Sequence, residues 1–446
     1  MRTADIVVIG GSAAGLTAAI TARRHYPEKK ILLIRKEERV LIPCGIPYIF
    51  GTVGSPQKNL IPDGIVEKNE IELLIDEVTA LDRESGQLGT RAGERIGYDR
   101  LILATGSLPS MPPIPGFELE NVFPVFKDVA HLEEMQKALQ GVRDLVIIGG
   151  GFIGVEFADE CKKSLDANVS IVEMLPHCLM LAYDEEFCAH AEDLLRDRGI
   201  APRTNTKVAR LVGNGRVQGV ELSGGETLPA QAVILGIGAT ANVDLAKNAG
   251  LPLGPTGGVV VDRTMRTMDP RIFACGDCAE KISFFGGRPS GLKLASIATA
   301  EARIAGASLF DTRRENIGTV GVWSTVIGDT AFATAGLTET LAARHGYNYV
   351  VGAAEAVNRH PGGMPGAHPL KVKLVFERHT GVLLGGQLMG DKAAGELINA
   401  VSACIQNRMT AEDIAMFQTG THPALTASPI AYQFVNAAEE AIAAAR

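Results

Sequence analysis

A single cysteine lies between two prolines near the start of the chain, in the stretch Pro43-Cys44-Gly45-Ile46-Pro47. A deprotonated thiol is the nucleophile that attacks disulfides and persulfides, and its pKa falls at the N-terminus of a helix. The prolines and Gly45 suit a constrained turn into such a helix. Cys44 therefore predicts thiol–disulfide chemistry. The alternative is a small buried apolar residue, the commoner fate of a free cysteine.

A glycine-rich turn that could bind a dinucleotide follows an apolar run at residues 144–148. It contains the fingerprint Gly149-x-Gly151-x-x-Gly154, a helical pattern begins at Phe152, and the next expected strand ends at Glu173. Such glycines let the backbone approach a pyrophosphate, and the strand-end carboxylate bonds the ribose hydroxyls. Strand, turn, helix and acid together predict a βαβ dinucleotide-binding unit.

A second turn of the same kind lies at residues 5–15, DIVVIGGSAAG. Gly10 and Gly15 are kept, but Ser12 replaces the middle glycine, and Arg35 stands at the strand end with Glu37 two residues on. We expect a helix over residues 13–25 and a strand over 31–34. Two such units predict two dinucleotides and electrons that pass between two redox carriers.

The composition of the 446-residue chain, 46% hydrophobic and 21% charged, is that of a folded globular protein. A net charge of -8 argues against nucleic-acid or anionic-membrane partners. No apolar run approaches the roughly 20 residues that cross a bilayer. The sequence enters a strand without a secretory signal pattern, and its seven scattered cysteines form no compact framework. We therefore expect a cytoplasmic protein.

The chain shows signs of several domains. The proline-rich stretch 108–116 marks a crossing between domains, and a second hinge is expected near 236–242. Beyond about residue 322 we expect strands over 350–357 and 370–376. An amphipathic helix is expected over 393–407 and a terminal helix over 436–446. These elements predict a separate C-terminal α+β domain.

Two further motifs complete an ordered set: YDRLILATG at residues 98–106 and IFACGD at 272–277. With the two glycine turns, they make the chain resemble the two-dinucleotide flavoprotein disulfide reductases over essentially its whole length. The resemblance implies an α/β fold with two Rossmann-type domains and a C-terminal dimerisation domain. FAD would bind residues 1–112 with 246–322, NAD(P)H would bind residues 113–245, and residues 323–446 would form the dimer.

The segment around Cys44 selects a subgroup within that family. Glutathione reductase-like members carry a second cysteine five residues on, where this chain has Ile49. The single-cysteine pattern CGxPY resembles coenzyme A-disulfide reductases, NADH-dependent persulfide and polysulfide reductases, and some NADH oxidases. Gly363 and Met364 stand where the coenzyme A subgroup has tyrosines. This departure gives no support for coenzyme A itself as the substrate.

The resemblance implies one catalytic residue, Cys44, no metal, and a set of residues that bind FAD and NADH, with NADPH possible. Asp277 would hold the ribityl and phosphate part of FAD, and Glu156 would approach the flavin and nicotinamide. The cofactor-binding residues are Gly10, Ser12, Ala13, Ala14, Gly15, Arg35, Glu37, Pro43, Ala104, Thr105, Gly106, Gly149, Gly151, Phe152, Ile153, Gly154, Glu156, Glu173, Gly238, Gly276 and Asp277.

Residues 360–368 and 421–428 are expected to line the active site of the other subunit in a homodimer, because the family places its C-terminal domain there. His422-Pro423 resembles the catalytic His-Pro of glutathione reductase-like members, but the glutamate expected near Ala427 is missing. A structural role is therefore the favoured interpretation of His422. Cys275 and Cys278 flank the Gly-Asp pair and are interpreted as structural cysteines.

The predicted reaction passes electrons from NAD(P)H through FAD to Cys44, which reduces a small disulfide, persulfide or polysulfide. Glu173 favours NADH, because a carboxylate repels a 2′-phosphate. One alternative is an NADH oxidase or peroxidase that cycles Cys44 through sulfenic acid. Another is an electron-transfer reductase that serves a partner protein, although it would not need Cys44.

Overall fold

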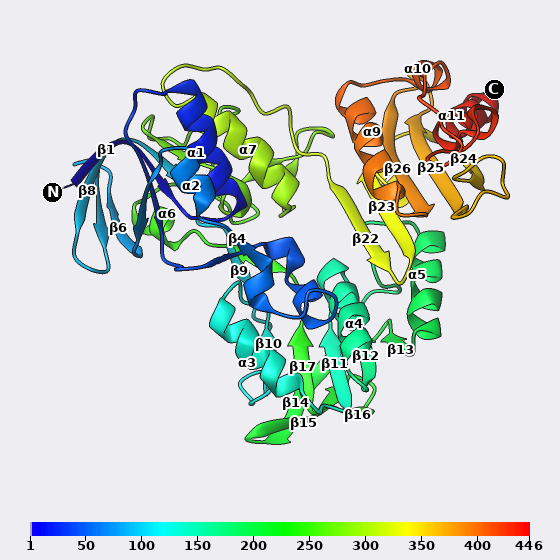
Figure 1. The fold of residues 1–446 in the computed structure, drawn as a ribbon, viewed down its shortest axis with the longest axis horizontal. Helices are drawn as coiled ribbons and strands as arrows, with labels where there is room; N and C mark the ends of the chain where they lie inside the picture. The colour runs from blue at the N-terminus through cyan, green and yellow to red at the C-terminus, as the bar shows by residue number, and fades with distance from the viewer. Residues whose placement is uncertain (1) are drawn as a thin grey trace. The chain divides into compact units, whose positions relative to one another are not determined.

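The computed structural model describes residues 2–446, and the chain divides into two compact units (Figure 1). The first comprises the residues up to Pro113 with Phe123–Gln140 and Ile237–Thr319. The second comprises Ile114–Val122, Gly141–Gly236 and Val320–Arg446. The predicted division into three domains is finer than these two units and stays a prediction.

A seven-stranded sheet forms the first unit from β1 (Arg2–Ile9), β2 (Ile31–Arg35), β5 (Glu72–Ile75), β6 (Val78–Asp82), β7 (Gln87–Thr90), β8 (Arg95–Leu103) and β19 (Ile272–Ala274). The order is β5-β2-β1-β8-β7-β6, and β19 also pairs with β8. β1, β2, β5, β8 and β19 run parallel, whereas β6 and β7 are antiparallel additions. The central parts of these parallel strands are apolar and buried, as in residues 6–9, 31–34 and 101–103, which is expected for a sheet covered on both faces.

Two long helices, α1 (Ala13–His25) and α7 (Ala295–Ala307), pack against each other in this unit (Figure 1). A Cβ added at Gly306 of α7 would lie 2.5 Å from the carbonyl oxygen of Ala18. The contact is therefore backbone on backbone, which small residues allow. Shorter elements of this unit are β3 (Val40–Leu41), β4 (Leu60–Ile61), α2 (Gly64–Lys68), β9 (Ser107–Pro109), α3 (Val129–Leu139), β18 (Ala239–Ala241), α6 (Asp244–Asn248), β20 (Lys281–Ile282) and β21 (Pro289–Ser290).

The second unit begins with a parallel sheet of β11 (Asp144–Ile148), β12 (Asn168–Val172), β13 (Ile200–Arg203) and β17 (Ala232–Leu235), in the order β17-β11-β12-β13. Its helices are α4 (Phe152–Ser164) and α5 (Glu185–Asp197). A small antiparallel sheet contains β14 (Val208–Asn214), β15 (Arg216–Leu222) and β16 (Thr227–Pro229), and β10 (Val122–Pro124) spans the boundary between the units.

A five-stranded antiparallel sheet completes the second unit with β22 (Val322–Ile327), β23 (Thr330–Gly336), β24 (Tyr349–Val357), β25 (Pro369–Glu377) and β26 (Leu383–Gly390). Their order is β22-β23-β26-β25-β24. The helices are α8 (Glu339–Arg344), α9 (Ala394–Gln406), α10 (Ala411–Ala415) and α11 (Gln433–Ala445). At Gly352 a Cβ would lie 1.9 Å from the carbonyl oxygen of Ala437, so α11 packs directly on β24.

These elements confirm the predicted fold class of two dinucleotide-binding βαβ units followed by an α+β region. The expected helix over 13–25 matches α1, and the expected strands over 350–357 and 370–376 fall within β24 and β25. The helix expected over 393–407 is α9, one residue shorter at each end.

Candidate active site

The first glycine turn joins β1 to α1 with no room for side chains. A Cβ at Gly15 would lie 1.8 Å from the carbonyl oxygen of Gly10, and one at Gly10 would lie 2.1 Å from that of Ala104. Gly10 also has φ +115°, which favours glycine. Ser12 is the N-cap of α1, yet its side chain caps no backbone N–H. Ala13 and Ala14 begin the helix, so this N-terminus presents backbone donors of the kind that bind a pyrophosphate.

The Gly-Asp pair predicted to hold FAD lies beside that turn. A Cβ at Gly276 would lie 2.8 Å from the Cβ of Ala14. Ser107 Oγ donates a 2.7 Å hydrogen bond to Asp277 Oδ2, and Lys127 Nζ lies 3.6 Å from the same oxygen. The structure thus brings together the segments that the resemblance assigned to FAD.

The end of β8 completes this neighbourhood. Thr105 exchanges hydrogen bonds with Asn242: its hydroxyl donates to the Asn242 carbonyl at 2.6 Å, and Asn242 Nδ2 donates to its carbonyl at 3.2 Å. Gly106 accepts the Asn242 amide, and the carbonyl of Gly238 accepts the Ser110 amide. These hydrogen bonds join the segment after β8, residues 105–110, to residues 238–242.

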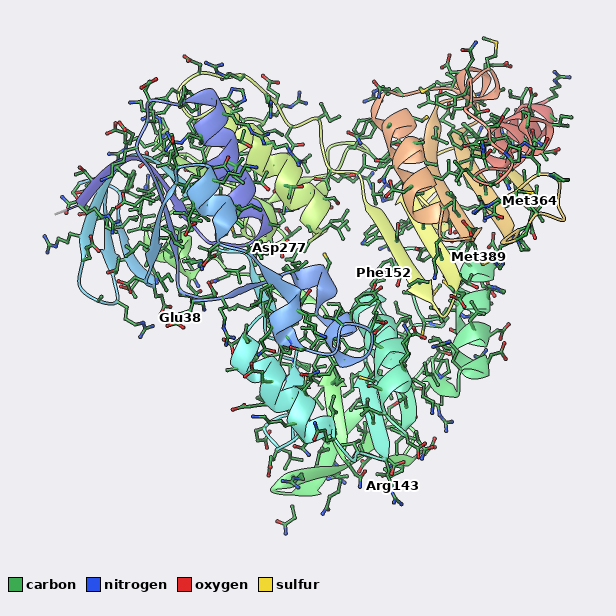
Figure 2. The ribbon with its side chains drawn as sticks, viewed as in Figure 1. Glu38, Arg143, Phe152, Asp277, Met364 and Met389 are labelled. Carbon is green, nitrogen blue, oxygen red and sulfur yellow. The ribbon has the colours of Figure 1, made fainter. Side chains whose placement is uncertain are left out.

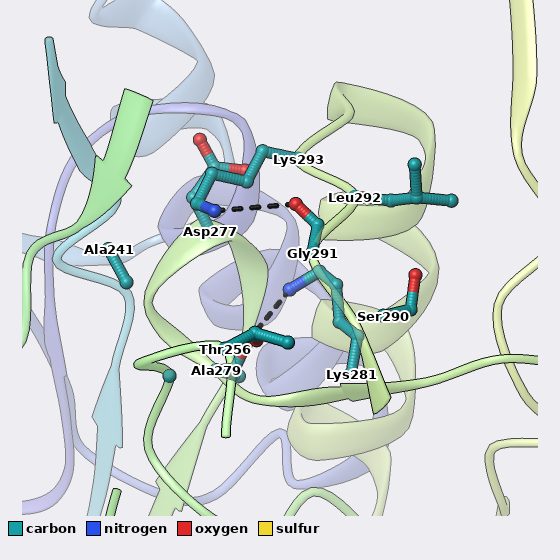
Figure 3. A pocket seen from close by; sticks show the side chains of 10 residues that line it. Ala241, Thr256, Asp277, Ala279, Lys281, Ser290, Gly291, Leu292 and Lys293 are labelled. Atoms are coloured by element: carbon teal, nitrogen blue, oxygen red, sulfur yellow. Dashed lines mark hydrogen bonds between the residues drawn. The ribbon is translucent and has the colours of Figure 1, made fainter. Parts of the chain in front are cut away.

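Figure 3 shows a small polar pocket that Asp277 shares with two lysines. Lys281 is buried and donates to the carbonyls of Gly276 at 2.6 Å and Ala279 at 3.0 Å, while Lys293 donates to Gly291 at 3.3 Å. The pocket is lined by Ala241, Thr256, Gly258, Asp277, Ala279, Lys281, Ser290, Gly291, Leu292 and Lys293. Sequence reasoning missed both lysines, because nothing in their spacing marks them as neighbours of Asp277.

A buried carboxylate supports the Gly-Asp pair from α7. Glu301 Oε2 accepts the Gly276 amide at 2.9 Å and lies 3.4 Å from Lys281 Nζ, whereas its Oε1 has no hydrogen-bond partner. Burial raises the pKa of Glu301 to about 7, although Lys281 opposes the shift. Glu301 therefore has one buried oxygen without a hydrogen-bond partner, and the N-terminus of α1 has backbone N–H groups without a side-chain cap. Both features fit a site that binds a polar cofactor.

Arg35 and Glu37 occupy the place where dinucleotide folds usually put an acid. Arg35 is buried, its stem lies against Gly11, and its guanidinium donates to the carbonyls of Glu37 and Glu38 at 2.8 Å each. Arg35 Nη1 and Nη2 also donate to the two Asp63 oxygens, at 2.6 and 2.8 Å. These bonds hold Arg35 within the protein, and any contact of Arg35 or Glu37 with FAD remains a prediction.

Cys44 lies in a 3-10 turn, Pro43–Gly45, which a second 3-10 turn over Pro47–Phe50 follows. The helix expected after the cysteine is present only as these short 3-10 turns, because Pro47 has no N–H to continue an α-helical hydrogen-bond pattern from Pro43. Cys44 is exposed, as its predicted role requires.

The other six cysteines are buried. Burial raises the pKa of Cys161, Cys178 and Cys188 to about 12 and also raises that of Cys275, Cys278 and Cys404. Thiols held in their neutral form are poor nucleophiles. Among the described residues, Cys44 is thus the one cysteine placed to react with a substrate.

The second glycine turn repeats the geometry of the first. A Cβ at Gly154 would lie 1.9 Å from the carbonyl oxygen of Gly149, whose φ is +104°. Gly151 is the N-cap of α4 and offers no side chain to cap it. Phe152 and Ile153 form the first turn of this helix (Figure 2), and Ile153 is partly exposed.

Glu173 lies directly beside this turn. It is only 8% exposed, and its carboxylate accepts the amides of Gly150 at 2.6 Å and Leu175 at 2.7 Å. The bonds fix a negative charge at the edge of the turn, where the predicted ribose would lie. This placement agrees with the predicted role, and the ribose contact itself remains a prediction.

Glu156, one helical turn into α4, is half-buried and faces β22. Thr325 Oγ1 donates a 3.0 Å hydrogen bond to it, and burial raises its pKa to about 7. Near it Trp323 stacks on Phe152, with ring centres 6.0 Å apart and planes at 9°. Sequence reasoning missed Trp323 and Thr325, since only tertiary packing brings this strand to α4.

The two C-terminal segments predicted to line the active site lie next to each other. The His360 amide donates to the carbonyl of Pro423 at 3.1 Å, and the His360 ring Nδ1 lies 3.1 Å from the Thr426 carbonyl oxygen. His422 Nδ1 accepts the Ala424 amide at 3.2 Å within its own turn. This bond agrees with a structural role for His422.

Two features are absent from residues 2–446, a metal-binding cluster and a membrane-spanning helix. No group of three or more His, Cys, Asp or Glu side chains gathers there in a way that could hold a metal ion. Over the same part of the chain, no helix is both long and apolar enough to cross a membrane.

Two glycine turns of this geometry, a Gly-Asp pair and one exposed cysteine define a two-dinucleotide oxidoreductase. The chain belongs to the pyridine nucleotide-disulphide oxidoreductase family, whose description matches residues 4–302. The dimerisation domain of the same family matches residues 322–430. It is therefore an oxidoreductase that uses FAD and a nicotinamide dinucleotide.

Three relatives show how close the match is. An NADH oxidase of Methanocaldococcus jannaschii is 30% identical over 422 residues, covering 92% of each chain. A CoA-dependent NAD(P)H sulfur oxidoreductase of Pyrococcus abyssi is 31% identical over 417 residues, again covering 92% of each. The solved NAD-dependent persulfide reductase of A. fulgidus superposes with a TM-score of 0.91 at 29% identity, covering 98% of this chain and 82% of the other.

Proposed function

We propose that this chain is an NADH-dependent reductase of small disulfides, persulfides or polysulfides, with Cys44 as its nucleophile. The observation that carries the proposal is the state of its cysteines: Cys44 is exposed, whereas the other six are buried. The sulfur oxidoreductase and persulfide reductase among its relatives support the same substrate class.

FAD fits the first unit, where Gly10, Gly15 and Gly276 let the first glycine turn, the end of β8 and the Gly-Asp pair pack closely around the N-terminus of α1. The uncapped N-terminus of α1 would hold its pyrophosphate, and Asp277 would hold its ribityl chain. When bound, FAD accepts hydride from the nicotinamide and supplies electrons to sulfur. The second turn, at Gly149–Gly154, would hold the pyrophosphate of NADH, and Glu173 its ribose hydroxyls.

Cys44 performs the sulfur chemistry in two steps. Its thiolate attacks the substrate R–S–S–R′, which breaks the S–S bond, releases R′–S⁻ and leaves a mixed disulfide, Cys44–S–S–R. Two electrons then reduce this bond to the Cys44 thiolate and R–S⁻. A hydroxyl in place of the thiol could perform neither step.

The chain acts as a homodimer in this account, and residues 360–368 and 421–428 cover the active site of the other subunit. The family dimerisation domain at residues 322–430 supports dimer formation. Sedimentation combined with activity assays tests the shared site. A monomer with full sulfur-reducing activity would contradict it.

An NADH oxidase that cycles Cys44 through sulfenic acid is the second candidate, because the Methanocaldococcus jannaschii relative bears that name. NADH consumption by the FAD-bound protein, measured side by side with inorganic polysulfide, coenzyme A disulfide, hydrogen peroxide and oxygen, separates the two. The proposal predicts the highest kcat/KM with one of the two sulfur compounds. A higher value with oxygen or peroxide would favour the oxidase.

A further inference from the structure

The segment that carries Cys44 is a loop closed at its base. The loop begins after Arg35, at the end of β2, and ends at Asp63, just before α2. Arg35 Nη1 and Nη2 donate to the two Asp63 oxygens at 2.6 and 2.8 Å. Because Arg35 is buried against Gly11, this closure joins the loop to the first glycine turn.

A second closure lies further along the loop. β3 pairs with β4 in antiparallel register, so that Val40 is opposite Ile61 and Leu41 is opposite Leu60. The strands have two residues each, too short to fix the far end of the loop alone. A third set of contacts lies closest to Cys44, and all of them involve Asn59.

Asn59 is only 5% exposed and satisfies both backbone groups of Ile42, the residue that precedes the Cys44 turn. The side-chain Nδ2 of Asn59 donates to the Ile42 carbonyl at 2.9 Å, and the main-chain carbonyl of Asn59 accepts the Ile42 amide at 2.9 Å. The Gly45 amide also donates to the Ile42 carbonyl, at 3.0 Å. The Asn59 side chain and the Cys44 turn therefore share one acceptor.

Asn59 also touches the residue that follows the cysteine. A Cβ at Gly45 would lie 2.0 Å from Asn59 Oδ1 and 2.9 Å from its Cγ. The amide thus fills the space beneath Gly45 while it bonds Ile42. One buried side chain holds the turn on both sides of Cys44.

We propose that Asn59 is the positioning residue of Cys44: it fixes the 3-10 turn so that the sulfur lies in line with the substrate disulfide. This inference rests on the proposed function of Cys44. In-line attack needs alignment, and a misplacement of about 1 Å can cost on the order of a hundredfold in rate. Asn59 acts through the Ile42 carbonyl and Gly45 and does not itself touch the substrate.

The test replaces Asn59 by Ala in the full FAD-bound protein. The matched control is Asn69→Ala, which removes a similar bond, from Nδ2 to the Ile65 carbonyl at 2.7 Å, away from the Cys44 loop. We expect kcat for NADH-dependent polysulfide reduction to fall roughly ten- to a hundredfold in Asn59→Ala, with KM nearly unchanged. NADH-dependent ferricyanide reduction, which does not need Cys44, should stay within twofold, and Asn69→Ala should match the wild type in both assays.

Hydrogen exchange measures the turn itself, whatever the substrate is. We expect the amides of Gly45 and Ile46 to exchange at least tenfold faster in Asn59→Ala and at the wild-type rate in Asn69→Ala. Unchanged exchange and unchanged polysulfide turnover would overturn the inference. Failure of the wild type to reduce both polysulfide and coenzyme A disulfide would instead contradict the proposed function, while the exchange data would still decide the role of Asn59.

A double-mutant cycle adds a second test. Gly45→Ala should lower polysulfide turnover at least tenfold, because its new methyl group would overlap Asn59. In the Asn59→Ala background that overlap is gone, so the double variant should be no worse than Asn59→Ala alone. Losses that multiply would contradict the proposed contact. Should Asn59→Ala fail to fold with FAD, Asn59→Asp keeps the shape but replaces the Nδ2 donor by a carboxylate oxygen that repels the Ile42 carbonyl, so it should show the same loss of turnover and the same faster exchange.

Discussion

Thr325, on β22, donates a 3.0 Å hydrogen bond to the carboxylate of Glu156 on α4. Glu156 is half-buried, and this burial raises its pKa to about 7. The nearby stack of Trp323 on Phe152 joins the same strand to the second glycine turn. The C-terminal sheet therefore helps to shape the predicted nicotinamide site of its own chain.

The first prediction concerns pH and stability at Glu156. Its folded-state pKa of about 7 lies above the ordinary 4.5, so the folded protein keeps a proton that the unfolded chain loses between these values. The stability contributed by this group is fully present below about pH 4.5 and is lost as pH rises through 7. Glu156→Gln should therefore raise the melting temperature at pH 8 by about 2 °C or more, and have a smaller effect at pH 5.

Thermal melts of the FAD-bound protein at both pH values measure this effect. Glu118→Gln, which changes an exposed acid, is the control and should shift neither melt. Thr325→Val should move the Glu156 transition to higher pH, because the lost hydrogen bond favours the charged form. An equal effect of Glu156→Gln at pH 5 and pH 8 would show that burial does not hold this proton.

The second prediction uses the one tryptophan of the chain. Because Trp323 stacks on Phe152, the first residue of α4, NADH binding at this turn should quench its fluorescence. Trp323→Ala should raise KM for NADH roughly two- to tenfold in the ferricyanide assay, as expected for loss of an aromatic pair. Trp323→Phe keeps a ring and should stay near the wild type. No quenching and an unchanged KM in Trp323→Ala would place NADH elsewhere.

The third prediction concerns coenzyme choice. The Glu173 carboxylate is fixed by the amides of Gly150 and Leu175, so its charge cannot easily move away from a 2′-phosphate. We expect kcat/KM with NADH to exceed that with NADPH at least tenfold. Glu173→Gln keeps the shape and should narrow the ratio, whereas Glu226→Gln, which removes an exposed acid, should not. A wild type that uses NADPH as well as NADH would refute the argument.

Much of the fold could be predicted from sequence, because its main signals are local. Gly149, Gly151 and Gly154 lie within six consecutive residues, and the positive φ of Gly149 and the close contact of Gly154 follow from one strand–turn–helix unit. The strands on either side are apolar runs of ordinary length. The helix expected after Cys44 is present only as two short 3-10 turns, because Pro47 cannot continue an α-helical hydrogen-bond pattern from Pro43.

The residues that support the site could not be predicted in the same way. Asn59 contacts Ile42 and Gly45 only because a loop closes on itself, and polar residues in loops are common. Thr325 reaches Glu156 across 169 positions of sequence. Contacts of this kind depend on tertiary packing, and they cannot be predicted from residue type or spacing.

The most direct test of the whole account is the Cys44→Ser variant, assayed with two electron acceptors. Hydride transfer from NADH to FAD does not involve the sulfur, so FAD content and ferricyanide reduction should match the wild type. Polysulfide and disulfide reduction should fall by at least a hundredfold, because a hydroxyl cannot replace the thiolate as nucleophile. Retained turnover with both sulfur compounds would contradict the account and show that electrons leave the flavin without passing through Cys44.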